Sequence, residues 1–306
     1  MSVKRTINKI SMSFQTAQKL GDNRQMALYL IGDVQGCDEA LGRLLQKIDF
    51  SPSRDSLYLL GDLVNRGPSN AATLRRLMGL AGSAHCLLGN HDLHLLAVSQ
   101  GVRKANPQDT CADVLQAPDR EALLTWLRQQ AMAIHTGRLL MVHAGVLPQW
   151  DVAQTLQLAH ELETVLRSPD WAQFMPHMYG GMPNVWHNSL AGADRLRIVV
   201  NALTRLRYCD AQGAMDFSVK ESAELAPSHL MPWFDVPQRR TQEVLLAFGH
   251  WSTLKSTHRN DVVCLDDGCV WGGCLSALRL PHAQVADFSQ AERISVDCEQ
   301  AQNPLA

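Results

Sequence analysis

The N-terminal third of the chain repeats one pattern of hydrophobic and polar positions. A short hydrophobic run at 27–31 ends in Gly-Asp, and an amphipathic pattern typical of a helix follows over 38–48. The same order returns with a hydrophobic run at 57–60, a helical pattern over 70–80 and a third run at 84–88. Strands that alternate with helices in this way predict parallel strands joined by crossover helices, which is the arrangement of α/β proteins.

The rest of the chain divides into longer and less regular segments. We expect a third helix to begin at 93–98, a polar helical insertion over 101–130 and mostly helical structure over 151–207. Segment 227–237 has the composition of a loop, and 283–306 is expected to be a C-terminal tail. Further strands are expected at 139–142, 244–248, 262–265, 270–271 and 274–280, the last three as closing antiparallel strands.

Composition places the chain among ordinary globular proteins. Of its 306 residues, 46% are hydrophobic and 19% are charged, and the formal net charge is -2. This charge argues against bulk electrostatic binding of nucleic acid or of an acidic membrane surface. No hydrophobic segment reaches the ~20 residues of a membrane-spanning helix.

The cysteines do not form a recognisable disulfide framework. No two of them make a CxxC pair, and a chain of this length does not need disulfides to hold its core. We interpret them as buried thiols of a protein in a reducing cytoplasm. They are Cys37, Cys86, Cys111, Cys209, Cys264, Cys269, Cys274 and Cys298.

Residues 1–25 form a basic segment that differs from the rest of the chain. Its hydrophobic stretch is too short and too polar for the core of a signal peptide. A transit peptide is one interpretation; a disordered extension, or a translation start assigned upstream of the natural one, is another. Met26 stands directly before the first hydrophobic run, which favours the second interpretation.

Five polar side chains follow predicted strands, each with a glycine adjacent or nearby. A lone Asp after Gly is usually a turn residue or a helix cap, and a lone His is usually structural. Five together instead indicate a metal site of mixed oxygen and nitrogen ligands, which suits Mn²⁺, Fe²⁺, Co²⁺, Zn²⁺ or Mg²⁺. Five ligands fit two metals that share a carboxylate and activate water. They are Asp33, Asp62, Asn90, His143 and His250.

The motifs around these residues resemble those of the calcineurin-like metallophosphoesterases. They are Gly32-Asp33-Val34-Gln35-Gly36, Gly61-Asp62-Leu63-Val64-Asn65-Arg66-Gly67, Gly89-Asn90-His91-Asp92, His143-Ala144-Gly145 and Gly249-His250. The resemblance implies an α/β fold of this type, a two-sheet β-sandwich flanked by helices and carrying helical insertions. It also implies one catalytic domain over 26–282, between the extension at 1–25 and the tail at 283–306.

Longer stretches resemble one branch of that family, the symmetrical diadenosine tetraphosphatases. They are Leu88–Ala97, Met178–Asn184, Asn201–Tyr208, Ala247–Trp251 and Leu265–Gly273. The branch implies hydrolysis of diadenosine tetraphosphate at its centre to two ADP, with a hydroxide bridging two metals as the nucleophile. Mn²⁺ or Co²⁺ is the expected metal. Removal of dinucleoside-tetraphosphate-like caps from RNA 5′ ends is a related capacity that the branch suggests.

The resemblance assigns the metal ligands residue by residue. Asp33 and Gln35 are expected to serve one metal and Asp62 to bridge. The other metal is expected to be held by Asn90, His143 and His250.

Other residues are expected to act on the substrate. His91 is expected to donate a hydrogen bond or a proton to the departing oxygen, and Arg66 to clamp phosphate oxygens in a bidentate manner. Asn201 and Arg205, four residues apart on one helical face, are candidates for holding outer phosphates, with a surface ion pair as the alternative for Arg205.

Two tryptophans are candidates for the nucleobase. Trp233 and Trp251 could stack on adenine, although packing in the core is the commoner role of a tryptophan.

Two positions depart from the family pattern. Gln35 stands where the wider family has His, and a neutral amide ligates weakly, so this metal is expected to be held less tightly. Asn65 stands where the protein-phosphatase relatives have an Asp that orients the catalytic His. His91 is therefore expected to be a weaker acid, which suits an anhydride with a good leaving group better than a phosphoprotein. The alternatives that stay open are a phosphoprotein phosphatase or broad phosphomonoesterase, and a catalytically weak nucleotide sensor.

Overall fold

The structure is a computed structural model that describes residues 26–219, 226–254 and 256–303. The basic segment predicted at 1–25 lies outside these residues. No helix within the described part of the chain is both long and hydrophobic enough to cross a bilayer.

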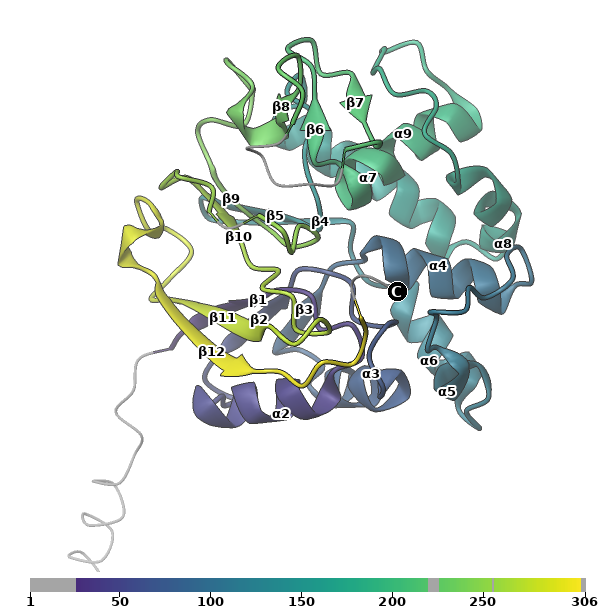
Figure 1. Cartoon of the computed structure of the whole chain (residues 1–306), viewed down its shortest axis with the longest axis vertical. Coiled ribbons are helices and arrows are strands. Elements are labelled where there is room, and N and C mark those ends of the chain that lie inside the picture. The colour runs from purple at the N-terminus through teal and green to yellow at the C-terminus, as the bar shows by residue number, and fades with distance from the viewer. Residues whose placement is uncertain (1–25, 220–225, 255, 304–306) are drawn as a thin grey trace, which may run out of the picture.

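Two β-sheets form the centre of the molecule (Figure 1). The first has the order β12-β11-β1-β2-β3, and its strands β1, β2 and β3 are parallel, as the alternation of strands and helices predicted. Strand β11 runs antiparallel between β1 and β12. The bounds are β1 (Leu28–Ile31), β2 (Ser56–Leu59), β3 (Ala84–Cys86), β11 (Cys274–Leu280) and β12 (Glu292–Asp297).

The second sheet has four strands in the order β10-β9-β5-β4. Strands β5, β9 and β10 are parallel to one another, and β4 runs antiparallel to β5. The antiparallel pairing expected for 262–265 is therefore wrong, because β10 pairs parallel with β9 at the edge of this sheet. The bounds are β4 (Ala133–Thr136), β5 (Leu139–Val142), β9 (Leu245–Phe248) and β10 (Val262–Cys264).

Helices cover the outer faces of the sandwich. Figure 1 shows α2 and α3 below the first sheet, and α7 packs against β4 of the second sheet. The insertion predicted at 101–130 contains α5 and α6, and 151–207 contains α7, α8 and α9. The helices are α2 (Asp38–Lys47), α3 (Asn70–Gly79), α4 (Asn90–Ser99), α5 (Ala112–Leu115), α6 (Arg120–Leu127), α7 (Val152–Arg167), α8 (Trp171–Phe174) and α9 (Gly192–Arg205), with 3-10 turns η2 (Met175–Met178), η4 (Trp233–Asp235) and η5 (Phe288–Gln290).

A small third sheet was not predicted. It has the order β7-β6-β8, with β6 (Tyr208–Cys209), β7 (Met215–Asp216) and β8 (Met231–Pro232). Strand β8 lies in the segment 227–237 that was expected to be a loop. Strands of two residues carry almost no periodicity, so the sequence pattern could not reveal them.

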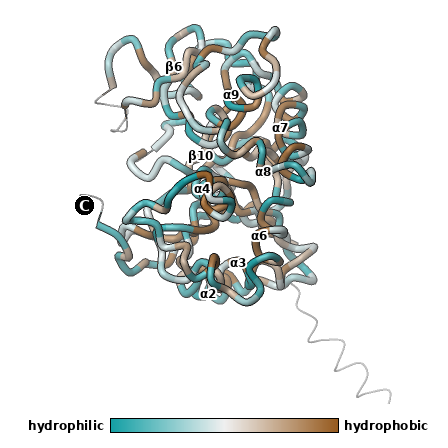
Figure 2. The backbone as a smooth tube through the Cα atoms, turned by 90° about the vertical axis from the view of Figure 1, so that its right-hand side faces the viewer, coloured by the Kyte–Doolittle hydropathy of each residue, from teal (hydrophilic) through white to brown (hydrophobic). Residues whose placement is uncertain are grey.

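The core consists of two layers that β1 separates. Leu28 and Leu30 face the second sheet, whereas Tyr29 and Ile31 pack with the residues of the helical layer. This is the period-2 alternation of a strand that is buried on both faces. Figure 2 shows hydrophobic stretches running through the middle of the molecule, around α4 and the sheets.

The C-terminal segment is part of the fold and not a tail. The tail expected at 283–306 is wrong for Glu292–Asp297, which form β12 along β11. Beyond this strand, the backbone N–H of Gln302 donates to the carbonyl of Val270 at 3.1 Å, and its Nε2 donates to the carbonyl of Arg66 at 3.1 Å. The end of the chain therefore touches a loop that carries predicted site residues.

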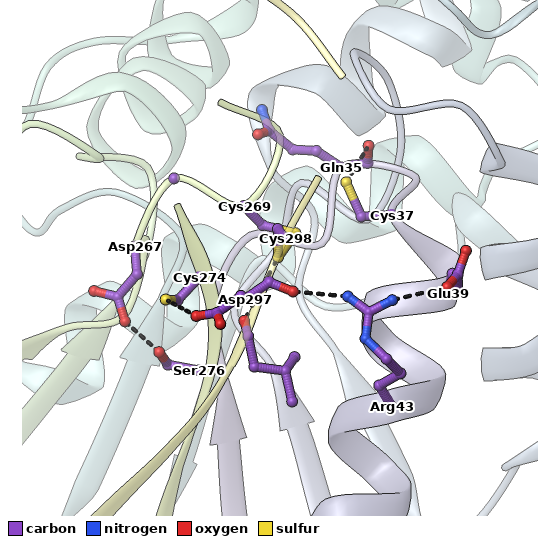
Figure 3. The surroundings of a disulfide bond; sticks show 12 residues. Gln35, Cys37, Glu39, Arg43, Asp267, Cys269, Cys274, Ser276, Asp297 and Cys298 are labelled. Atoms are coloured by element: carbon purple, nitrogen blue, oxygen red, sulfur yellow. Dashed lines mark hydrogen bonds and ion pairs between the residues drawn. A yellow bond between two sulfur atoms is a disulfide. The ribbon is translucent and has the colours of Figure 1, made fainter. Parts of the chain in front are cut away.

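A disulfide joins this segment to the loop before β11 (Figure 3). Cys269 and Cys298 are paired with a Cα–Cα distance of 5.2 Å, so the interpretation of every cysteine as a free thiol is wrong for these two. The other six are free, and all of them except Cys274 are buried. Figure 3 also shows Arg43 of α2 donating to the carbonyl of Asp297, at 2.7 Å.

The strand expected at 270–271 does not form. Trp271 makes only an isolated bridge, to Gln300. This part of the loop is a series of tight turns between β10 and β11.

Candidate active site

The predicted ligand residues meet where the carboxyl ends of strands from both sheets come together. Asp33 follows β1 and Asp62 follows β2, while His143 directly follows β5 and His250 follows β9. Asn90 is the first residue of α4, after β3. Parallel strands place their carboxyl ends at the same edge of a sheet, so residues far apart in the sequence converge there.

Measured distances confirm that the side chains of this cluster are close together. Ligand atoms of Asp62, His143 and His250 all lie within 4.8 Å of one another. His143 Nε2 lies 3.4 Å from Asp62 Oδ2 and 3.3 Å from Asn90 Oδ1. Asp33 joins the cluster through Oδ1, which accepts from the backbone N–H of His250 at 3.0 Å.

Gln35 lines the same cavity as Asp33, Asp62 and His250. Its side chain is buried at 6% exposure. A cavity of ≈ 460 Å³ therefore contains the side chains of the first two motifs, including the glutamine that replaces the family's histidine.

The charges of the cluster favour a bound cation. Burial, the nearby carboxylate of Asp266 and that of Asp62 raise the pKa of Asp33. Although burial alone would lower it, Asp62 and Asp33 raise the pKa of His143 to about 10. The carboxylates thus favour positive charge in the site. A bound divalent ion would provide this charge in place of a proton on His143.

Two buried polar atoms also fit a metal. His250 Nε2 is buried and has no hydrogen-bond partner among the described residues. Burial and the cation of Arg207 lower the pKa of His250, which leaves this imidazole neutral and free to ligate. Turning the Asn90 amide over would make its nitrogen a donor to His250 Nδ1 and to Thr204 O, each at 2.9 Å. Only one of the two orientations of the Asn90 amide therefore directs its oxygen toward an ion.

The backbone of the site is held in an unusual conformation. Gln35, Asp62, Asn65, Arg66 and His250 all have positive φ, between 47° and 78°. Left-handed backbone costs on the order of 1 kcal/mol for a residue with a Cβ, and such residues gather at functional sites. This concentration in the three strand-end loops supports a function for them beyond turning the chain.

Two motif glycines are required because ligand side chains lie so close to them that there is no room for a Cβ. A Cβ on Gly89 would lie 2.0 Å from Asp62 Oδ1, and a Cβ on Gly249 would lie 2.0 Å from Asp33 Oδ1. Neither glycine has positive φ, so close approach rather than backbone angle excludes a side chain here.

Gly89→Ala and Gly249→Ala are expected to displace these carboxylates and to weaken metal binding about 10- to 100-fold. Isothermal titration of the metal-free variants with Mn²⁺ measures this directly. Gly79→Ala, at the end of α3 with nothing within 4 Å of the added Cβ, is the matched control. Unchanged affinity in both site variants would contradict the packing described here.

His91 and Arg66 lie beside the cluster. The backbone N–H of His91 donates to Asp62 Oδ1 at 2.8 Å, and its Nδ1 lies 3.1 Å from Asn65 Nδ2. Arg66 Nη1 donates to Gln108 of the helical insertion. The position that carries Asp in protein-phosphatase relatives therefore still contacts His91, through an amide.

A second cavity of ≈ 400 Å³ adjoins the first. Both are lined by Arg66, Asn90, His91 and Arg205. The second extends from these residues over the helical part of the molecule to Tyr179. Asp33, Asp62 and His250 line only the first cavity, and the residues shared by the two cavities lie beside them.

The substrate residues are only partly where they were expected. Asn201 is fully buried; its amide donates to Gly180 O at 2.9 Å and accepts from Arg205 Nη1 at 2.8 Å. Asn201 therefore orients Arg205 and does not face either cavity. Arg205 makes no ion pair within the described residues, so the surface-pair alternative is not what this structure has; its guanidinium lies 4.7 Å from the ring of Phe217.

The expectation that tryptophans stack on adenine is wrong for this structure. Trp233 and Trp251 are 0% and 1% exposed. Trp233 packs edge-on against Phe234, and Trp251 packs edge-on against Tyr208. Neither ring presents a face to a ligand, and packing in the core, the commoner role, is what the structure has.

Three charged residues of the first cavity were missed from the sequence, namely Arg207, Asp216 and Asp266. Asp266 is buried, and burial together with Asp62 raises its pKa to about 6. It follows β10 and precedes a glycine by two residues, so the strand-and-Asp pattern could have identified it. Arg207 also lines this cavity and donates to His250 O at 2.9 Å. It follows a helix, and no local pattern marks it.

A two-sheet sandwich with carboxylates and imidazoles at its strand ends defines the class of metal-dependent phosphoesterases. Residues 26–203 match the family model of the calcineurin-like phosphoesterases, and the chain belongs to this family. The fold predicted by the motifs is therefore confirmed.

Curated proteins are similar to this one over almost the whole length of the chain. It is 56% identical to a protein of Acidovorax ebreus and 57% identical to one of Delftia acidovorans, which cover 92% and 91% of this chain and are themselves covered completely. Both are named symmetrical bis(5'-nucleosyl)-tetraphosphatase. A crystal structure assigned provisionally as a diadenosine tetraphosphatase superposes with a TM-score of 0.56 at 22% identity, over 90% of this chain and 96% of its own, which supports the fold.

Proposed function

We propose that this enzyme hydrolyses diadenosine tetraphosphate between its two central phosphates and releases two molecules of ADP. The proposal is supported by relatives with that activity in their name, at 56% identity over nearly the full length. The observation that carries it is the pair of adjoining cavities, ≈ 460 and ≈ 400 Å³. A substrate with a nucleoside at each end needs room on both sides of the bond that is cut.

The residues that would hold two divalent ions are Asp33, Gln35, Asp62, Asn90, His143 and His250. When bound, such ions lower the pKa of a water molecule and neutralise charge on the phosphoryl group. We propose Mn²⁺ or Co²⁺, with Mg²⁺, Fe²⁺ or Zn²⁺ as alternatives, because the ligands combine carboxylate, amide and imidazole. Of the six, Gln35 is the weakest ligand, so the ion beside it should exchange most readily.

The cationic residues would bind and orient the polyphosphate. Arg66 and Arg205 line both cavities, so each can contact phosphates on either side of the cleavage point. Arg207 adds a partly buried positive charge in the first cavity. His91, which lines both cavities, would donate its Nε2–H to the oxygen that departs with the second ADP.

Two further parts of the proposal concern context. Action in the cytoplasm is supported by six free cysteines, five of them buried, although the disulfide of Cys269 with Cys298 does not favour a reducing compartment. Activity on dinucleoside-tetraphosphate-like RNA caps would use the same site, with one nucleotide end extended into a chain.

The test is an analysis of products from diadenosine tetraphosphate across a series of metals. ADP as the sole nucleotide product is expected, at rates that are highest with Mn²⁺ or Co²⁺. AMP together with ATP would show asymmetric cleavage and overturn the proposal. Release of phosphate from a phosphopeptide at a higher kcat/KM would favour a phosphoprotein phosphatase, and nucleotide binding without turnover in any metal would favour a sensor.

A further inference from the structure

The carboxylate of Asp109, in the helical insertion beside the site, accepts hydrogen bonds from three N–H groups. Asp109 Oδ1 accepts from Asn65 Nδ2 at 2.9 Å. Its Oδ2 lies 2.9 Å from His94 Nε2 and accepts from the backbone N–H of Asn106 at 2.6 Å. The side chain of Asp109 is only 4% exposed, and although burial opposes it, these hydrogen bonds lower its pKa. An ionised carboxylate can only accept, so all three partners must donate to it.

The direction of these bonds fixes the amide of Asn65. Its Oδ1 accepts from the backbone N–H groups of Arg66, at 2.8 Å, and of Thr110, at 3.1 Å. One hydrogen of its Nδ2 is given to Asp109, and the other points to Nδ1 of His91, 3.1 Å away. Nδ1 of His91 is therefore an acceptor, and the proton of the neutral ring is on Nε2.

The same carboxylate fixes a second histidine. Because His94 donates from Nε2 to Asp109, its Nδ1 accepts from the hydroxyl of Tyr179, at 2.9 Å. Tyr179 lines the second cavity, with the guanidinium of Arg103 4.1 Å from the centre of its ring. A continuous series of hydrogen bonds thus connects this cavity to His91, and both His94 and Asn65 donate to the carboxylate of Asp109 at its centre.

We propose that Asp109 is a positioning residue of the reaction: through Asn65, it holds the ring of His91 with its N–H on Nε2, toward the reacting phosphate. His91 Nε2 lies 4.0 Å from Asp62 Oδ2, and His91 lines both cavities, so this N–H faces the site. The inference rests on the proposed function only in that a leaving oxygen departs on the side of His91. It gives the insertion a part in the chemistry, although none of its residues is a predicted ligand.

The substitution Asp109→Asn changes the hydrogen-bond count without changing the shape. Three N–H groups converge on two acceptor oxygens, and an amide replaces one of those oxygens with an NH₂ group. In place of Oδ2 the NH₂ group would face two donors, His94 Nε2 and the backbone N–H of Asn106. In place of Oδ1 it faces only Asn65 Nδ2, so it is expected to lie there and to force the Asn65 amide to turn. The ring of His91 is no longer held in one tautomer, so the hydrogen bond to the leaving oxygen is lost in part of the molecules.

Kinetics with aryl phosphates of graded leaving-group pKa test this consequence. With the poorest leaving groups, kcat of Asp109→Asn is expected to fall about 10- to 100-fold, because these need the hydrogen bond most. With the best leaving groups the fall should be less than ~3-fold. Asp113→Asn is the matched control, since Asp113 belongs to the same insertion but accepts from Ala71 N and Asn70 Nδ2 of α3. It should lower kcat equally for all esters, or not at all.

The ring nitrogens of His91 provide a readout that needs no variant at position 109. In ¹⁵N spectra of histidine-labelled wild-type protein loaded with diamagnetic Mg²⁺, Nδ1 of His91 should be unprotonated and Nε2 protonated. His91→Gln assigns the signals by their absence. A wild-type ring protonated on Nδ1 would overturn the inference, as would an Asp109→Asn variant whose folded protein keeps the wild-type dependence on leaving group.

The inference and the proposed function fail separately. If wild-type protein hydrolyses aryl phosphates with this dependence but leaves diadenosine tetraphosphate intact, the proposed substrate is wrong and the role of Asp109 stands. If the dinucleotide is cleaved to ADP while Asp109→Asn behaves like the control, the role of Asp109 is wrong.

Discussion

Asp62→Ala is expected to abolish hydrolysis, with a loss in kcat on the order of 10⁴-fold, and to remove most of the bound metal. The carboxylate of Asp62 lies 3.4 Å from His143 Nε2 through Oδ2, and its Oδ1 accepts from the backbone N–H of His91. It therefore contacts both another member of the ligand cluster and the backbone of His91. Its loss removes the shared ligand and frees the loop of His91.

Metal content per chain, measured by elemental analysis after dialysis, and turnover in excess Mn²⁺ check this expectation together. Asp119→Ala, which removes an exposed partner of Arg75, serves as a control for losing a carboxylate. An Asp62→Ala protein that kept the full rate would end the proposal of a metal-assisted reaction at this cluster.

His91→Ala is expected to lower kcat about 10²- to 10⁴-fold while leaving the metal content near that of the wild type. The reason is that His91 contributes its backbone N–H to Asp62 Oδ1, which alanine retains, and only its ring to the leaving group. The loss should be smallest for substrates whose leaving oxygen is already a weak base. The two readouts therefore separate this variant from Asp62→Ala.

His85→Ala is the matched control for His91→Ala. His85 lies on β3 of the first sheet, where it is exposed and stacks on Tyr58 at 4.9 Å between ring centres. It should keep its rate. Loss of metal from His91→Ala, or an unchanged rate, would count against the assigned role.

The strand-end residues could be predicted because local sequence determines both their element and their direction. Asp33 and Asp62 each follow a short hydrophobic strand and a glycine, and parallel strands bring such positions to one edge. The distance between them could not be predicted from local sequence, since convergence depends on the pairing of β1 with β2. That pairing is a non-local property that the alternation of strands and helices only implies.

Residues that act through long-range contacts could not be predicted. Asp109 reaches Asn65 across 44 positions, from an insertion whose hydrophobic pattern indicates only helices. Arg207 enters the first cavity after the end of α9, where nothing in the local pattern distinguishes it from a surface arginine. Their positions depend on how the helical segments fold back over the sandwich.

The C-terminal segment was misjudged for a related reason. Strand β12 is an edge strand with no fully buried residue, so its sequence lacks the continuous hydrophobic run that marks a strand buried on both faces. The pairing of Cys269 with Cys298 spans 29 positions and has no sequence signature of its own. The assignment of Trp233 and Trp251 to the nucleobase failed for a different reason. Residue type alone does not distinguish a tryptophan packed in the core from one that stacks on a ligand.

The covalent link between Cys269 and Cys298 makes buffer composition part of any kinetic comparison. Dithiothreitol opens such a bond. The residues after β12 then keep their hydrogen bonds to Val270 and Arg66 but lose the covalent link. Stocks kept with and without a thiol reagent are therefore chemically different preparations. An affinity tag fused after Ala306 would be attached to this same short segment.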